Sequence, residues 1–173
     1  MKRTGSAVLV VFVALLLAMI LGSTALAVPP GTTSAVSGGW TWENNSATVS
    51  DGPGGTMVFA GDEFGAWTGS FRGTSYDVFT MTFYPPLETE ANPKVLGPAM
   101  GDLTATFTGK VGVNRGTMTM YFTIWEPADS YVMTGTWTIL SGTKALKHVR
   151  GSGTWVSSGV DSSATYAGTI TWK

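Results

Sequence analysis

One acidic residue stands among apolar residues at a spacing that could support acid–base chemistry. Asp77 shares its parity with Phe79, Met81 and Phe83 in a stretch that alternates every second residue. This alternation predicts a β-strand with the four side chains on one face. If that face points inward, apolar surroundings raise the pKa of the carboxyl and let it act as an acid or a base. The alternative is a position at the rim, solvated or paired with Arg72, because ionisable groups are rarely buried without a partner.

Methionine and phenylalanine residues in the alternating stretches predict an apolar interior. We expect these residues first of all to form a hydrophobic core. Methionine is flexible and fills irregular space, so the same residues would also suit an adaptable cavity for an apolar ligand. The candidate ligand-binding residues of the interior are Asp77, Phe79, Met81, Phe83, Met118, Met120 and Phe122.

Other catalytic chemistries find no support in the sequence. There is no cysteine, and no serine stands in the pattern of a nucleophile elbow. His148 is the one histidine, which excludes a multi-histidine metal site. It lies in the polar connection over residues 144–150, where an exposed side chain is expected. Gly151-Ser152-Gly153 precedes a strand, so the helix N-terminus that binds phosphate is missing. We therefore predict no catalytic residue, no metal and no cofactor, and an enzyme is the less expected outcome.

The first 27 residues have the pattern of a secretory signal peptide. Lys2 and Arg3 precede an apolar run over residues 7–21, and a small-x-small site ends at Ala27. The alternative is an uncleaved anchor, in which case this segment would be the part of the protein that contacts a membrane. A spanning helix needs about 20 apolar residues, however, and the run over 7–21 is shorter. We expect an apolar signal helix over 1–27, an extended segment over 28–37 and one domain over 38–173. Its location is then the cell envelope or the medium.

The composition favours an all-β domain held by its core. Lys2 and Arg3 are two of ten basic residues, so the mature chain carries eight basic and eleven acidic residues, a net charge of −3. That balance offers no basic patch for nucleic acid. Abundant glycine, seven tryptophans and only 12% charged residues are typical of strands rather than helices. An exported chain without cysteine has no disulfide to stabilise it.

Short alternating stretches separated by turn residues predict about eight or nine strands. The clearest lie at 117–125 and 165–172, where apolar residues alternate with threonine. The proline-rich segment 85–100 is expected to be a loop, either over a binding site or as a plain surface excursion. These features predict a small closed antiparallel barrel of about eight strands, calycin-like, wide enough to be filled by side chains or to hold one small ligand. Turns are expected at 51–55, 61–63, 73–75, 112–116 and 127–130.

Glycine, threonine and aromatic residues recur at 65–75, at 116–119, and at 136–139 followed by Gly142-Thr143, Leu146, Arg150-Gly151, Gly153–Trp155 and Tyr166–Gly168. Together they resemble the allene oxide cyclase-type barrel, which includes plant dirigent proteins and bacterial families of unknown function. The resemblance is closest to the uncharacterised bacterial members and covers nearly all of the chain from about residue 38. It implies an eight-stranded barrel with an apolar cavity, often assembled as dimers or trimers. The catalytic residues of the plant enzymes do not map onto this chain, so no activity is carried over.

Three functions remain open. The leading one is an exported barrel that binds a small apolar ligand or serves as a stable envelope module. The second is a cyclase or isomerase that confines a reactive substrate, with Asp77 as a participant. The third is an outer-membrane barrel whose apolar residues face lipid, although such strands need about 9–11 residues and several here look shorter.

Overall fold

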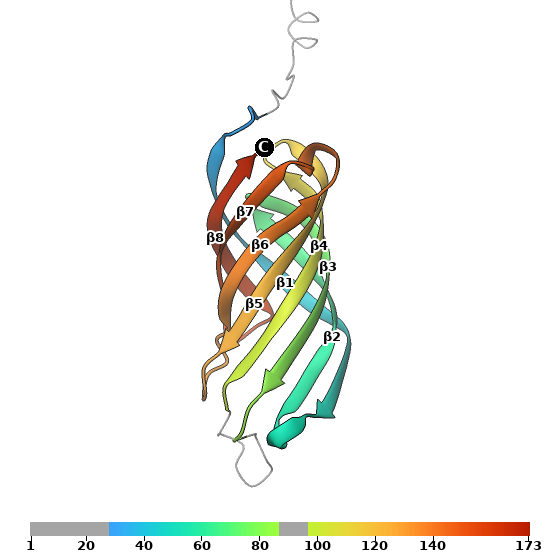
Figure 1. The fold of residues 1–173 in the computed structure, drawn as a ribbon, viewed down its shortest axis with the longest axis vertical. Helices are drawn as coiled ribbons and strands as arrows, with labels where there is room; N and C mark the ends of the chain where they lie inside the picture. The colour runs from blue at the N-terminus through green and yellow to red at the C-terminus, as the bar shows by residue number, and fades with distance from the viewer. Residues whose placement is uncertain (1–27, 87–96) are drawn as a thin grey trace, which may run out of the picture.

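The chain folds as one closed antiparallel sheet. The computed structural model describes residues 28–86 and 97–173. Each strand pairs with its neighbours in the sequence, and the last pairs back with the first, so the sheet closes into a barrel (Figure 1). This confirms the expected all-β antiparallel architecture, whereas the expected signal helix lies outside the described residues. The strands are β1 (Thr33–Asp51), β2 (Met57–Gly69), β3 (Phe71–Phe83), β4 (Ala99–Val111), β5 (Asn114–Glu126), β6 (Thr134–Gly142), β7 (Val149–Ser157) and β8 (Ser163–Trp172), with short 3-10 turns η1 (Pro53–Gly55) and η2 (Lys144–Leu146).

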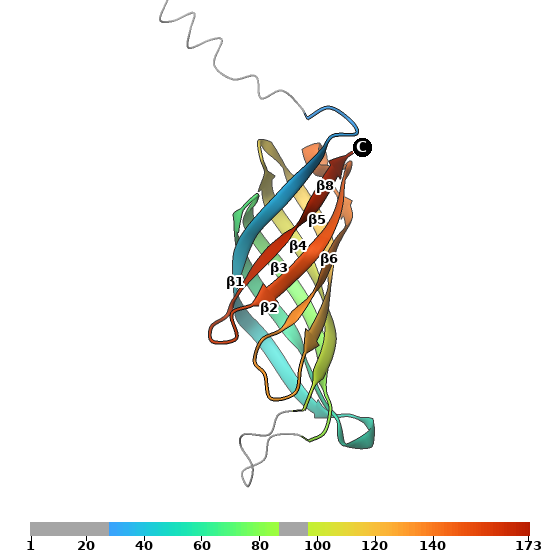
Figure 2. The ribbon, with the colours of Figure 1, turned by 90° about the vertical axis from the view of Figure 1, so that its left-hand side faces the viewer.

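The first strand is the longest and leaves one end of the barrel less completely closed. β1 pairs with β8 from Thr33 to Thr41, and beyond that its ladder runs with β2 as far as Asp51 (Figure 2). A β-bulge between Asn44 and Ser46 interrupts that second ladder. Residues 33–37, expected as an extended segment before the domain, therefore belong to the barrel wall.

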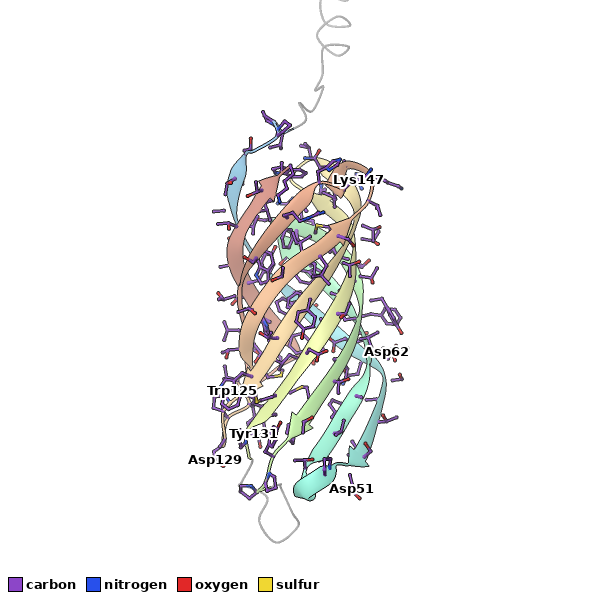
Figure 3. The ribbon with its side chains drawn as sticks, viewed as in Figure 1. Asp51, Asp62, Trp125, Asp129, Tyr131 and Lys147 are labelled. Atoms are coloured by element: carbon purple, nitrogen blue, oxygen red, sulfur yellow. The ribbon has the colours of Figure 1, made fainter. Side chains whose placement is uncertain are left out.

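The two faces of the wall differ in chemistry. Side chains project from both faces, with Asp62 among those on the outside (Figure 3). Threonines are frequent on the outer face, as on β4 and β5, where Thr104, Thr106, Thr117 and Thr119 alternate with buried residues. The hydrophobic effect thus places the apolar set inside. The largest fully buried side chains are Trp137, Phe71, Phe107, Phe122, Met118, Met120, Leu146, Val149 and Asp77.

Aromatic stacking packs the half of the interior that lies toward the start of β1 and the end of β8, around Phe71, Trp137 and Tyr166. Phe71 stacks on Tyr166 with ring centroids 5.0 Å apart, and Trp137 meets both rings edge-on. The Tyr166 hydroxyl accepts a hydrogen bond from the Phe71 amide at 2.9 Å and donates one to the Thr68 carbonyl at 3.0 Å. Gly168 leaves room for Trp137, since a Cβ there would overlap its ring. This half of the interior is therefore a packed core.

Two of the expected turns are wrong, because β2 and β3 run straight through them. Gly61 and Gly73 lie inside these strands. A Cβ at Gly61 would lie 2.9 Å from the Ala47 backbone, and one at Gly73 would lie 2.7 Å from the Gly109 backbone. These glycines therefore permit close approach of a neighbouring strand rather than a change of direction. The chain turns instead at Ser70, after Gly69 with a φ of 87°.

The other expected turns coincide with turns of the structure, except that β5 already begins at Asn114, so only Gly112 and Val113 of the expected 112–116 turn lie outside the strands. η1 occupies the 51–55 turn, Gly112 adopts a φ of 60° between β4 and β5, and Asp129 adopts a φ of 55° between β5 and β6. Most of the expected loop, residues 87–96, lies outside the described residues. Within the described part of the chain, no helix has the length and apolar character needed to cross a membrane.

Candidate functional site

The end of the barrel away from the chain termini contains a cavity of about 110 Å³. Six of its twelve lining residues are aromatic and four are aliphatic, so the wall is mostly apolar. Trp42, Phe59 and Met133 are half-buried and Asn44 is exposed, so the cavity reaches the surface. Its lining residues are Trp40, Trp42, Asn44, Phe59, Glu63, Phe79, Met81, Leu103, Phe122, Ile124, Met133 and Trp155.

Tryptophans from two strands, β1 and β7, form much of the wall. Trp40 stacks on Trp67 with ring centroids 4.9 Å apart and an interplanar angle of 13°. Trp40 also contacts Trp155, at 5.5 Å between centroids. The Trp155 indole donates to the Thr123 carbonyl at 2.9 Å, which fixes its orientation. Because these rings are held by stacking and hydrogen bonds, the cavity is largely pre-formed.

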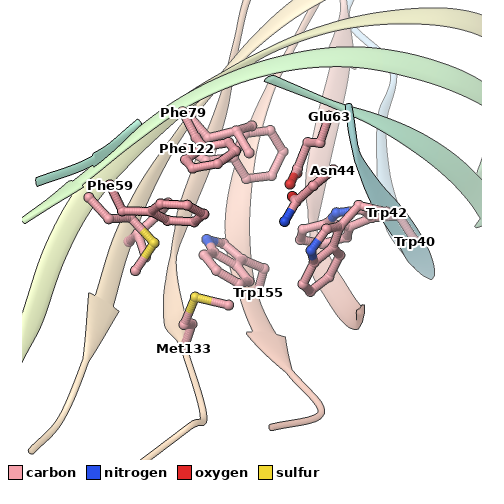
Figure 4. Close-up of a pocket in the computed structure, with 12 residues that line it drawn as sticks. Trp40, Trp42, Asn44, Phe59, Glu63, Phe79, Phe122, Met133 and Trp155 are labelled. Carbon is pink, nitrogen blue, oxygen red and sulfur yellow. The ribbon is translucent and has the colours of Figure 1, made fainter. Parts of the chain in front are cut away.

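Glu63 is the charged residue of this lining. In β2 every second residue points inward, and Glu63 stands two positions before Gly65 and four before Trp67, so it shares their inward face. Its side chain is 6% exposed. The residue paired with it on β1 is Asn44. Figure 4 shows the Glu63 carboxyl and the Asn44 amide pointing toward each other beside the tryptophan rings. The cavity thus combines an apolar wall with one polar corner.

Burial makes Glu63 a weak acid. It raises the pKa of the Glu63 carboxyl to about 8, and the negative charge of Asp77 adds to the rise. The neighbouring Asp62 points outward, where hydrogen bonds from Ser46 and Asn45 lower its pKa. The pKa values of these two adjacent acids on one strand are therefore shifted in opposite directions. At neutral pH the cavity presents a protonated carboxyl, which can donate a hydrogen bond or a proton.

Asp77 lies directly behind Glu63. The two residues are paired across β2 and β3, and directly opposed residues of antiparallel strands have Cβ atoms about 5 Å apart. Asp77 is 0% exposed, and burial raises the pKa of its carboxyl to about 6, partly offset by the hydrogen bond from Ser75. Its Oδ1 is buried without a hydrogen-bond partner. The interpretation of Asp77 as a solvated rim residue paired with Arg72 is therefore wrong.

A chain of hydrogen bonds holds the other oxygen of Asp77. The Trp67 indole donates to Ser75 Oγ at 2.8 Å, and Ser75 Oγ donates to Asp77 Oδ2 at 3.0 Å. Gly65 faces this chain, and a Cβ there would lie 3.1 Å from Asp77 Oδ2 and closer still to Ser75 Oγ. The missing side chain at Gly65 therefore makes room for the network. This network therefore fixes the orientation of the Asp77 carboxyl, whose negative charge raises the pKa of Glu63.

The candidate ligand-binding residues separate into three groups. Phe79, Met81 and Phe122 line the cavity. Met118 and Met120 are fully buried and do not line it. Asp77 lies behind the lining, and Phe83 is half-buried where β3 ends. The alternation identified the inward face correctly, and the cavity occupies only part of that face.

Sequence reasoning missed the polar residues of the cavity. Glu63 fell in the stretch expected to turn, although its parity with Trp67 would have placed it inside a continuous strand. The contact between Trp40 and Trp155 joins β1 to β7, strands far apart in the sequence, and it depends on the closure of the barrel. Among residues 28–86 and 97–173, no three histidines or acidic residues are grouped to hold a metal ion.

The fold and the cavity define a small antiparallel β-barrel whose interior is packed around Phe71, Trp137 and Tyr166 and hollow beside Trp40, Glu63 and Trp155. A protein of unknown function from the DUF3224 family of Shewanella oneidensis MR-1 has a similar structure, with a TM-score of 0.62 over 82% of this chain and 98% of that chain. The sequence identity is 12%, so the likeness shows the fold alone. No protein-family model matches the chain, and no curated protein matches it.

Proposed function

We propose that this protein is an exported barrel that binds a small apolar molecule in the cavity lined by Trp40, Glu63 and Trp155. The observation that carries the proposal is that one half of the interior is packed while the other keeps an aromatic-lined space that reaches the surface. An engineered cavity of about 150 Å³ binds benzene. A space of about 110 Å³ therefore suits a ligand, or the end of a ligand, of roughly that size. Export, and assembly as dimers or trimers of the allene oxide cyclase type, belong to the same proposal.

Catalysis in the same cavity is the second candidate, because two carboxyls of different acidity are adjacent. Glu63 would contact the substrate as a proton donor, and Asp77 would act through Glu63 as a positioning residue. Pairs of acids whose pKa values are pushed apart are typical of acid–base catalysts. An outer-membrane barrel would need a continuous apolar band outside. On this outer face threonines are frequent and lie between the exposed apolar residues, which include Phe64, Val78 and Trp125. This mixed outer face favours a barrel in water.

Methionine methyl groups provide a direct test with benzyl alcohol as the probe. Met81 and Met133 line the cavity, and Met118 and Met120 are buried elsewhere. With ¹³C-labelled methionine methyls, benzyl alcohol should shift the first two NMR signals and leave the second two unchanged. An aromatic ring bound within about 5 Å of a thioether is the expected cause.

A cavity-filling variant provides the control. Leu103 lines the cavity, so Leu103→Phe should weaken benzyl alcohol binding by at least about tenfold. Thr104→Ala, on the outer face of the same strand, should leave it unchanged. Shifts confined to exposed Met100, or equal binding to Leu103→Phe and the unmodified protein, would contradict the proposed site.

A further inference from the structure

The buried acidic and basic side chains of the described residues are all carboxyls. They belong to Glu63, Asp77 and Glu126, and no lysine or arginine of the described residues is buried. Glu126 is the next inward residue after Ile124 on β5, toward the end of the barrel that contains the cavity. No lysine or arginine contributes to the pKa shifts of these three carboxyls. Buried carboxylates are normally paired with a positive charge, and the described residues supply none to these three carboxyls, so a carboxyl that ionises here would gain from a cationic partner.

The aromatic walls around Glu63 are suited to bind a cation. Indole faces attract cations, and cages of aromatic rings recognise ammonium groups. The cavity has three tryptophans and three phenylalanines in its lining, and a nearly buried carboxyl faces into it. A neutral ligand could use the aromatic wall, but it would leave Glu63 protonated and would make no use of its carboxylate.

We propose that the ligand is a small organic ammonium cation, with its nitrogen at the Glu63 carboxyl and its apolar body among the tryptophan rings. This inference rests on the proposed function and adds the chemical class of the ligand. The proton that Glu63 holds in the empty cavity leaves to solvent when the ammonium binds, so charge and protons balance. The ammonium then forms a charge-assisted hydrogen bond to the carboxylate in place of that proton.

The groups around Glu63 determine the pH dependence. Asp77 is the titratable residue that faces Glu63 from β3, and the paired residue on β1 is Asn44, which does not titrate. Phe122 and Trp155 line the cavity from β5 and β7, and Glu126 lies farther along β5. Binding an ammonium requires the Glu63 proton to leave, so affinity for the cation should rise with pH until that carboxyl is ionised.

Benzylamine and benzyl alcohol test the inference, because they differ only in the charged group. Calorimetry at pH 6, 7 and 8 should show benzylamine, protonated throughout, binding at least about tenfold more tightly than benzyl alcohol at pH 8. Its affinity should rise by at least about tenfold from pH 6 to pH 8, with proton release at pH 7. Benzyl alcohol should bind equally or more weakly as the pH rises.

Glu63→Gln keeps the size of the side chain and removes its charge. It should weaken benzylamine binding by at least about tenfold, and by more than it weakens benzyl alcohol binding. Glu43→Gln, on the exposed outer face of β1, should change neither. If both probes bind equally at every pH, or if Glu63→Gln leaves benzylamine affinity intact, the inference is overturned while the proposed function stands. If neither probe binds, both are overturned.

Discussion

At pH 8, the Glu63→Gln variant is expected to be more stable than the unmodified protein by up to about 4 kcal/mol. Replacement of a buried side chain usually destabilises a protein, so the sign of this effect is diagnostic. Burial raises the pKa of the Glu63 carboxyl from an ordinary 4.5 to about 8. The folded state therefore has to ionise a buried group as the pH rises, and glutamine avoids that penalty.

The direction of the pH dependence follows from proton counts. Between about pH 4.5 and 8 the folded protein keeps the Glu63 proton that the unfolded chain has lost. The free energy of unfolding therefore falls as the pH rises through this window, by up to about 1.4 kcal/mol per pH unit. Asp77 adds a similar fall between about 3.8 and 6. A comparison between pH 6.5 and 8 isolates Glu63.

Urea unfolding at pH 6.5 and pH 8 measures this effect. The unmodified protein should lose about 2 kcal/mol between the two conditions, and Glu63→Gln should lose much less. Glu43→Gln removes a carboxyl from the outer face of β1 and should behave like the unmodified protein. Equal pH dependence in all three proteins would show that Glu63 is not a weak acid in the folded state.

A single methyl group at Gly65 is expected to destabilise the fold by about 2–4 kcal/mol. A Cβ at this position would meet Ser75 Oγ, with Asp77 Oδ2 at 3.1 Å and the Trp67 indole nitrogen at 3.3 Å. The hydrogen-bond chain that holds Asp77 would have to separate, and its buried polar groups would lose their partners. Urea unfolding of Gly65→Ala at pH 6.5 measures the loss.

The double variant Gly65→Ala/Ser75→Ala separates the steric cause from a general intolerance of substitution. Ser75→Ala alone removes two hydrogen bonds and should be destabilising. It also removes the atom that the new methyl group would meet, so the double variant should lose less stability than the sum of the two single variants. A simply additive loss would mean that Gly65 does not act through the Ser75 hydroxyl.

The inward face of the strands could be predicted from the sequence, because apolar residues and threonines alternate on them. In β5 the period of two places Met118, Met120 and Phe122 inside, as expected. The same argument placed Asp77 inside, against the competing expectation of a solvated rim position. Alternation depends only on local backbone geometry and on burial, so it can be seen in one sequence.

The cavity could not be predicted in the same way. Gly61 and Gly73 resembled turn residues, but the neighbouring strand in a tightly curved barrel needs their missing side chains. Interpreting Gly61 as a turn cut β2 short and hid Glu63. The position of the cavity depends on the sizes of side chains from strands far apart in the sequence. Trp40 and Phe122 are examples, because they come into contact only when the barrel closes.

The most direct test of the account is the titration of the Glu63 carboxyl by ¹³C NMR, with and without benzylamine. We expect the free protein to show a pKa of about 8 and the benzylamine complex to show a lower value, because the bound ammonium stabilises the carboxylate. A glutamate signal that titrates near its ordinary value of about 4.3 and does not respond to benzylamine would contradict Glu63 as the recognition group of the cavity.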